Sequence, residues 1–124
     1  MRVLGRVARP AVYDLAALRA LGETDLTAVL DCTSGWAMAT VWRGVPLGTL
    51  LDLARPLDGA SRIDVRSVTG WGAAFDLAQA RGTLLATGIA GRPLPTPNGA
   101  PCRLVVPDRR GLDWVKWVTE VEVS

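Results

Sequence analysis

The sequence predicts a single α+β domain, residues 1–124, in which mixed or antiparallel sheets are interrupted by short helices. The chain has the length of one ordinary domain. Hydrophobic residues make up 49% of it and charged residues 21%, which is typical of a folded chain. Strand-like stretches outnumber helical ones, and the two kinds do not alternate in a βαβ rhythm. These observations favour an α+β architecture over a parallel α/β one.

The first half of the chain contains three expected strands and two expected helices. Asp14 can cap the first helix, and Pro46 suits the first turn of the second. In the second helix, apolar residues recur at i, i+3, i+4 and i+7 and make one apolar face. The strands are expected at residues 1–7, 25–32 and 38–44, and the helices at residues 15–21 and 46–54.

The middle of the chain continues with a strand, a helical turn and a hairpin. Residues 62–68 alternate between apolar and polar side chains, which predicts a half-buried strand. Asp76 and Gln79 form a capping-box-like start for a short helical turn. Residues 84–94 predict a hairpin that turns at Ala90 and Gly91.

Two strands are expected near the C-terminus, at residues 102–107 and 114–123. Strict alternation through the second of them places Val115 and Trp117 on its apolar face. The same alternation places Trp114 and Lys116 on the opposite face, where a lysine needs water or an anion as its partner.

The composition excludes several classes of site. The chain has no histidine and two cysteines, so Ser-His-Asp triads, Cys-His dyads, HExxH sites and zinc fingers are all ruled out. The net charge of +2 does not indicate a nucleic-acid partner. No apolar run is long enough to span a membrane, and the N-terminus lacks the apolar region of a signal peptide. We therefore expect a soluble chain, whose compartment the sequence does not identify.

Cys32 has two interpretations. Its position in the expected strand 25–32 places it with Leu26, Ala28 and Leu30, which favours a buried, inert thiol. It also lies at a polar strand end beside Thr33, where a thiolate is accessible and can bind a soft metal. Cys102 precedes an apolar run and is interpreted as structural, although a disulfide between the two cysteines is conceivable.

The C-terminal third gathers basic residues around loops rich in glycine and proline. Arginine side chains and loop amides suit phosphate or a polyanionic cofactor, and the simpler alternative is a solvated basic face. No Walker A or GxGxxG motif is present. Most of the five tryptophans are expected in the core, with one or two at the rim of a site. The basic residues are Arg92, Arg103, Arg109, Arg110 and Lys116.

An ordered series of motifs over nearly the whole chain resembles the molybdopterin-binding domain of the sulfite oxidase family, which includes bacterial methionine-sulfoxide reductases. The closing segment is similar to the family pattern HGxPxRLVVPGxxGxxxVKW, with Asn98 at the histidine and Asp108 at a glycine. The motifs are "LGRVARP", "YDLAALRAL", "LDCTSGW", "WRGVPLGTLL", "VRSVTGW", "FDLAQA" and "NGAPCRLVVPDRRGLDWVKWVTEVEV".

The resemblance implies an oxidoreductase domain with a molybdenum–molybdopterin cofactor and two-electron oxygen-atom transfer at the metal. It implies that Cys32 is the metal ligand and catalytic residue. It also implies a redox or membrane partner subunit, and related domains are often exported or membrane-linked. The alternative is a cofactor-free member of the same fold that acts as a binding or interaction module. The implied cofactor-binding residues are Thr33, Asn98, Gly99, Arg103 and Lys116.

Overall fold

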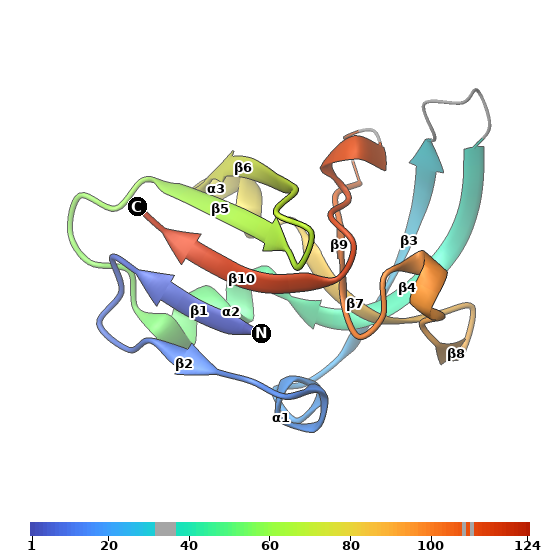
Figure 1. The fold of residues 1–124 in the computed structure, drawn as a ribbon, viewed down its shortest axis with the longest axis horizontal. Helices are drawn as coiled ribbons and strands as arrows, with labels where there is room; N and C mark the ends of the chain where they lie inside the picture. The colour runs from blue at the N-terminus through green and yellow to red at the C-terminus, as the bar shows by residue number, and fades with distance from the viewer. Residues whose placement is uncertain (32–36, 108, 110) are drawn as a thin grey trace.

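Two five-stranded sheets, joined by short helices, make up the fold (Figure 1). The structure is a computed structural model that describes residues 1–31, 37–107, 109 and 111–124. It confirms the expected α+β class with mixed sheets. Within the described residues, no helix is both long and apolar enough to cross a bilayer.

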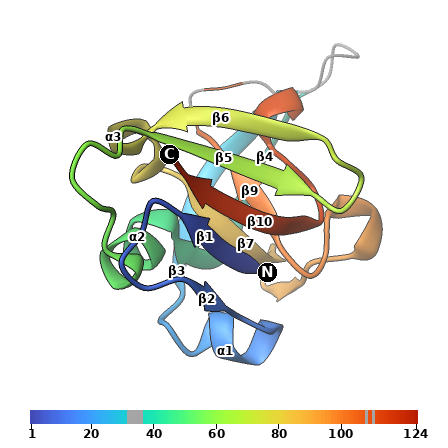
Figure 2. The same ribbon diagram turned by 60° about the vertical axis from the view of Figure 1, so that its left-hand side comes forward.

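The first sheet has the strand order β2-β1-β10-β5-β6. Figure 2 shows these strands side by side. Strand β1 pairs with β10 in parallel, although the two lie at opposite ends of the chain, and the other pairs are antiparallel. The bounds are β1 Arg2–Gly5, β2 Ala11–Val12, β5 Arg62–Ser67, β6 Gly72–Asp76 and β10 Val118–Val123.

The second sheet has the order β3-β4-β7-β8, and β9 pairs with β7 as well. All of its pairs are antiparallel. The β7–β8 hairpin turns at Ala90 and Gly91, as expected, and both residues have positive φ, of 51° and 76°. The bounds are β3 Thr24–Asp31, β4 Ala37–Pro46, β7 Leu84–Ile89, β8 Arg92–Pro93 and β9 Arg103–Val105.

Three short α-helices follow their predicted signals. Helix α1 (Leu15–Arg19) begins at Asp14, whose Oδ1 accepts a hydrogen bond from the Ala17 amide at 2.7 Å. Helix α2 (Leu47–Ala54) begins after Pro46 and buries its whole predicted apolar face. Helix α3 (Leu77–Ala80) follows the capping box, in which Gln79 Oε1 accepts from the Asp76 amide at 3.2 Å. Two 3₁₀ turns, η1 (Thr96–Asn98) and η2 (Gly111–Asp113), complete the fold.

The core consists of apolar side chains from both sheets and from α2. Each fully buried Leu, Ile or Val contributes roughly 1.5–3 kcal/mol relative to exposure. In β3 and β5, buried residues alternate with less buried ones, as expected: Ala28 and Leu30 of β3, and Ile63 and Val65 of β5, are buried. The largest fully buried side chains include Trp42, Trp114, Leu47, Leu50, Leu51, Ile63 and Leu85.

The expectation for residues 114–123 is wrong in its first half. Strand β10 begins only at Val118, because Trp117 has a φ of 51°, and a bulge follows between Val118 and Glu120. Trp114, expected opposite the apolar face, is buried with 1% of its surface exposed. Alternation therefore does not run through the segment. Strand β6 is an element that the sequence did not reveal.

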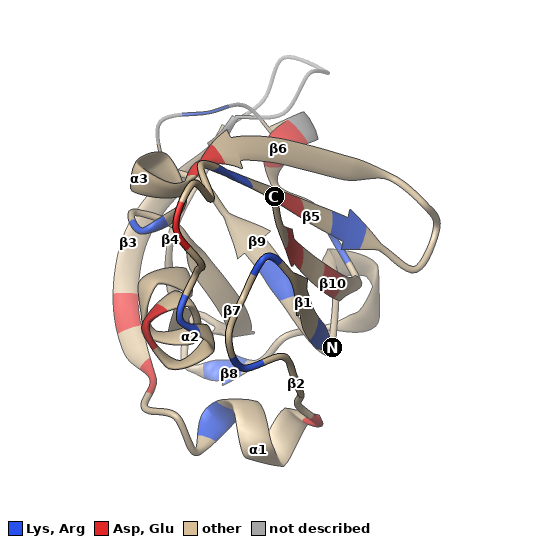
Figure 3. Cartoon of the chain, turned by 90° about the vertical axis from the view of Figure 1, so that its left-hand side faces the viewer, with Lys and Arg blue, Asp and Glu red and all other residues tan. Residues whose placement is uncertain are grey.

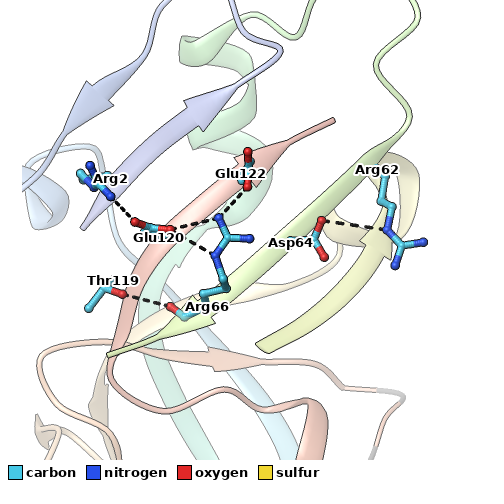
Figure 4. A network of polar contacts seen from close by, with 7 residues as sticks. All are labelled: Arg2, Arg62, Asp64, Arg66, Thr119, Glu120 and Glu122. Carbon is cyan, nitrogen blue, oxygen red and sulfur yellow. Dashed lines mark hydrogen bonds and ion pairs between the residues drawn. The ribbon is translucent and has the colours of Figure 1, made fainter. Parts of the chain in front are cut away.

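A network of charged side chains crosses the outer face of the first sheet (Figure 4). Arg66 on β5 donates to Glu120 at 3.0 and 3.1 Å and to Glu122 at 2.6 Å, and Arg2 on β1 also donates to Glu120. In Figure 3, acidic and basic segments adjoin on β5 and β10. Hydrogen bonds from Arg2, and then from Arg66, lower the pKa of Glu120.

The lowered pKa predicts a pH-dependent contribution of Glu120 to stability. The ionised carboxylate is favoured in the folded state, so its stabilisation is present above the ordinary pKa of 4.5 and is lost as pH falls through the lower folded-state value. We expect Glu120→Gln to lower the melting temperature at pH 7 and to flatten its dependence on pH below 5. Thermal unfolding across pH measures both effects.

The matched control is Asp58→Asn, which removes an exposed carboxylate that makes no ion pair among the described residues. Equal melting curves for Glu120→Gln and the unaltered chain would contradict the role of this network.

Candidate functional site

The candidate site lies where β9 and the segment before β10 meet the turn that follows η1. The Gly99 amide donates to the Thr96 carbonyl at 3.0 Å, which closes the turn. The Trp117 amide donates to the Gly99 carbonyl at 3.2 Å, and the Trp117 indole Nε1 donates to the Thr96 carbonyl at 2.8 Å. These bonds hold Asn98 and Gly99 beside Lys116.

Gly99 allows a close approach that another residue would block. Its φ of 116° is one that L side chains rarely adopt. A Cβ at this position would lie 3.0 Å from the Cβ of Arg103, and 3.1 and 3.2 Å from the Cβ and Cα of Lys116. The turn, β9 and the start of the last segment therefore pack together only because residue 99 has no side chain.

Arg103 on β9 is a buried cation, with 4% of its surface exposed. Its Nε donates to the Trp114 carbonyl at 3.3 Å, and its Nη1 donates to the Asn98 carbonyl at 3.2 Å. The guanidinium carbon lies 5.8 Å from the ring centroid of Trp42 and 5.9 Å from that of Trp114. Two carbonyls and two indole faces thus hold the guanidinium in one position.

The two indoles beside Arg103 are themselves hydrogen-bonded to two separate segments, β3 and the segment that contains Arg109. Trp42 and Trp114 pack edge to face, with centroids 5.4 Å apart. Trp42 Nε1 donates to the Ala28 carbonyl of β3 at 3.4 Å, and Trp114 Nε1 donates to the Arg109 carbonyl at 3.0 Å. Strand β3, which leads toward Cys32, is therefore linked to Arg103 through a single side chain.

A pocket of about 250 Å³ opens beside these residues. Lys116 Nζ lies 5.5 Å from the ring centroid of Trp117, and Trp71, at the rim, is 55% exposed. Among the described residues, no carboxylate lies within ion-pair distance of Lys116. The pocket offers cations, hydroxyls and flat indole surfaces, which suit an anionic ligand with a planar part. Its lining is Ser67, Thr69, Trp71, Arg103, Gly111, Trp114, Val115, Lys116 and Trp117.

The structure brings together four of the six predicted site residues. Gly99 packs on Arg103 and Lys116, and the Asn98 carbonyl accepts from Arg103. Cys32 and Thr33 lie outside the described residues, as does Asp108. Among the described residues, no group of three or more His, Cys, Asp or Glu side chains could hold a metal.

The end of β5 and the turn that follows it contribute Ser67 and Thr69 to the pocket, and neither was among the predicted site residues. Trp71, from the same turn, was one of the tryptophans expected either in the core or at a rim. Ser67, Thr69 and Trp71 all lie within the motif "VRSVTGW" of the family resemblance, which is the signal that could have identified them.

Trp42 and Trp114 are buried in the core, and Trp71 and Trp117 line the pocket together with Trp114. Two of the four described tryptophans are therefore core, fewer than the majority expected, and Trp36 lies outside the described residues.

Cys102 is a buried free thiol, as predicted, and not half of a disulfide. Its Sγ donates to the Val118 carbonyl at 3.6 Å, and burial raises the pKa of the thiol to about 11.

The burial of Cys102 predicts that iodoacetamide will not alkylate it in the folded protein at pH 8, because the reactive thiolate is scarce and enclosed. Peptide mass spectrometry measures the modification, and the same reaction in denaturant is the control, in which Cys102 should be fully alkylated. Alkylation of Cys102 in the folded chain at the rate of a free thiol would contradict its place in the core.

The packing at Gly99 predicts that Gly99→Ala destabilises the protein more than Gly22→Ala. Both glycines have positive φ, 116° and 103°, but no atom lies within 4 Å of a Cβ at residue 22. We expect about 1–3 kcal/mol from the backbone conformation in each variant, and a further cost of about 1–3 kcal/mol from the contacts at residue 99. Denaturant unfolding measures the difference, and equal losses would show that the close approach is unimportant.

The chain is similar to known proteins over its whole length. Residues 1–124 match the family described as the oxidoreductase molybdopterin binding domain. The chain is 34% identical over 139 residues to the protein-methionine-sulfoxide reductase catalytic subunit MsrP of Xanthomonas campestris pv. campestris, covering 98% of this chain and 43% of the relative. It is 30% identical to the protein of the same name from Gluconobacter oxydans, covering 99% and 46%.

Among solved structures, the sulfane dehydrogenase SoxCD from Paracoccus pantotrophus superposes with a TM-score of 0.93 at 25% identity. The match covers 99% of this chain and 37% of that one. The chain thus spans less than half the length of these relatives. A family match over all 124 residues, together with this shared fold, shows that the chain belongs to the oxidoreductase molybdopterin-binding domain family, with a sulfite oxidase-type fold.

Proposed function

We propose that this domain holds a molybdenum–molybdopterin cofactor and is the cofactor-binding part of an enzyme that transfers oxygen atoms. Cys32 is the proposed metal ligand and catalytic residue. The observation that carries the proposal is the convergence of Gly99, Arg103 and Lys116 beside one pocket, at the positions that match the family's closing motif. The other proposed cofactor-binding residues are Thr33 and Asn98.

The described side of the pocket fits an anionic cofactor that also has a planar part. Lys116 supplies a mobile ammonium, and Arg103 supplies a fixed guanidinium. The indole of Trp117 offers a flat face next to Lys116. A thiolate at Cys32 would suit molybdenum, since thiolates are preferred by soft, redox-active metals. When bound, the cofactor supplies two-electron oxygen-atom transfer at its metal.

In this proposal the protein's own residues bind and orient. Arg103 does not move on binding, because Trp42, Trp114 and two carbonyls already hold it, so little entropy is lost there. Lys116 is free to turn toward a phosphate group. Asn98 contributes hydrogen-bonding capacity without charge, so Lys116 and Arg103 carry the neutralisation of the ligand.

We also propose that a separate protein exchanges electrons with this domain. The Xanthomonas relative is named a catalytic subunit, which supports a division of labour between subunits. The alternative function is a cofactor-free binding module of the same fold, which the neutral Asn98 in place of a histidine favours.

Production of the chain in a host that makes molybdenum cofactor tests the proposal. We expect near-stoichiometric molybdenum by elemental analysis, and pterin fluorescence after denaturation. Cys32→Ser should lose most of the metal, and Lys116→Gln should weaken pterin binding by about tenfold or more, the effect of removing one charged hydrogen bond, so that occupancy falls at limiting cofactor.

Three controls make the result decisive. Cys102→Ala removes the other thiol, and Arg62→Gln removes an exposed cation of the first sheet, and both should load as the unaltered chain does. The Xanthomonas relative, produced in the same host, reports whether the host supplies cofactor. A loaded relative beside a chain with neither metal nor pterin would overturn the proposal in favour of the cofactor-free module.

A further inference from the structure

A second cavity, of about 220 Å³, lies away from the candidate site and shares no lining residue with it. Three arginines line this cavity, and they come from three segments that are distant in sequence. Arg19 ends α1, Arg43 lies on β4, and Arg92 begins β8. Figure 3 shows basic segments on α1 and close to β8 on the same side of the molecule. We call this cavity the arginine pocket.

A single anchored carboxylate organises two of the three arginines. Glu23 Oε1 lies 3.7 Å from Arg43 Nε and 4.0 Å from Arg19 Nε. The hydroxyl of Thr87 donates to Glu23 Oε2, and only 13% of the Glu23 side chain is exposed. Glu23 is thus fixed in the wall of the pocket, and it orients both guanidinium groups without filling the cavity.

Positive charge exceeds negative charge around the arginine pocket. Glu23 is the only acidic residue in the lining, and Asp25, outside the lining, pairs with Arg43 at 3.1 Å. Arg92 is exposed, and among the described residues no carboxylate lies within ion-pair distance of it. Three guanidinium groups therefore face two carboxylates, which leaves an unbalanced cation at the rim.

Between Arg43 and Arg92, the backbone of Gly88 lines the pocket. A Cβ on Gly88 would lie 3.0 Å from the Arg92 carbonyl oxygen and 3.6 Å from the Arg43 Cβ, so the glycine lets β7 approach both residues closely. An anion seated there would meet the guanidinium fork of Arg92, the geometry that binds carboxylate and phosphate oxygens in pairs. It would also meet Nη2 of Arg43, whose Nε and Nη1 face Glu23 and Asp25.

We infer that the arginine pocket binds a small dianion, a phosphate or a dicarboxylate, through Arg43 and Arg92, with Arg19 and Glu23 as positioning residues. The ligand brings negative charge to a pocket that has one unbalanced cation, and the cavity accommodates a compact ligand of this kind. This site is independent of the proposed cofactor, because its residues are separate from the cofactor pocket.

Isothermal titration calorimetry with inorganic phosphate and, separately, with succinate tests the inference at pH 7 and constant ionic strength. We expect saturable binding of at least one of the two anions with one site per chain. Arg92→Gln and Arg43→Gln should each raise the Kd by about tenfold, because a charge-assisted hydrogen bond to the ligand is lost. Circular dichroism melting verifies that both variants are folded.

Two control variants locate the binding. Arg62→Gln removes the same charge from an exposed position on β5 and should leave the Kd unchanged. Lys116→Gln alters the cofactor pocket and reports whether the anion binds there instead of in the arginine pocket. The inference is overturned if neither anion binds saturably, if Arg62→Gln weakens binding as much as Arg92→Gln, or if only Lys116→Gln abolishes binding.

Discussion

The candidate site depends on one contact, the buried guanidinium of Arg103 against the indoles of Trp42 and Trp114. Removing a cation from water costs several kcal/mol unless hydrogen bonds and charge compensate it. At Arg103 the carbonyls of Asn98 and Trp114 accept its hydrogens, and the faces of Trp42 and Trp114 add cation–π attraction. Because these partners come from three separate segments, the same contact also brings the segments together.

The position of the pocket follows from the way the last strand is interrupted. A continuous strand from residue 114 would have carried Lys116 along the sheet, away from the turn at Gly99. The positive φ of Trp117 instead ends the preceding segment early and directs the Trp117 amide to the Gly99 carbonyl. Gly99, lacking a side chain, then lets Lys116 approach Arg103. Two departures from regular structure therefore place both cations at one pocket.

Arginine and glutamate side chains interact both in the network on the first sheet and in the arginine pocket, but in different proportions. On β5 and β10, Arg66 lies between two carboxylates, so its charge is balanced and the network joins strands. In the arginine pocket the guanidinium groups outnumber the carboxylates, and the surplus faces a cavity. The excess of guanidinium groups over carboxylates therefore distinguishes the arginine pocket from the balanced network on the first sheet.

Sequence alone determined most of the local elements and the family, and it predicted four residues that meet at the candidate site. Caps, turns and period-two patterns depend on neighbours a few residues apart, so the sequence predicts them. Asp14, the capping box at Asp76 and the turn at Ala90 and Gly91 all act over such distances. Only the tertiary structure decided that Trp114 is buried, that β1 pairs in parallel with β10, and that Ser67 and Thr69 reach the pocket. These outcomes depend on contacts between segments far apart in the chain, whose packing overrides local alternation.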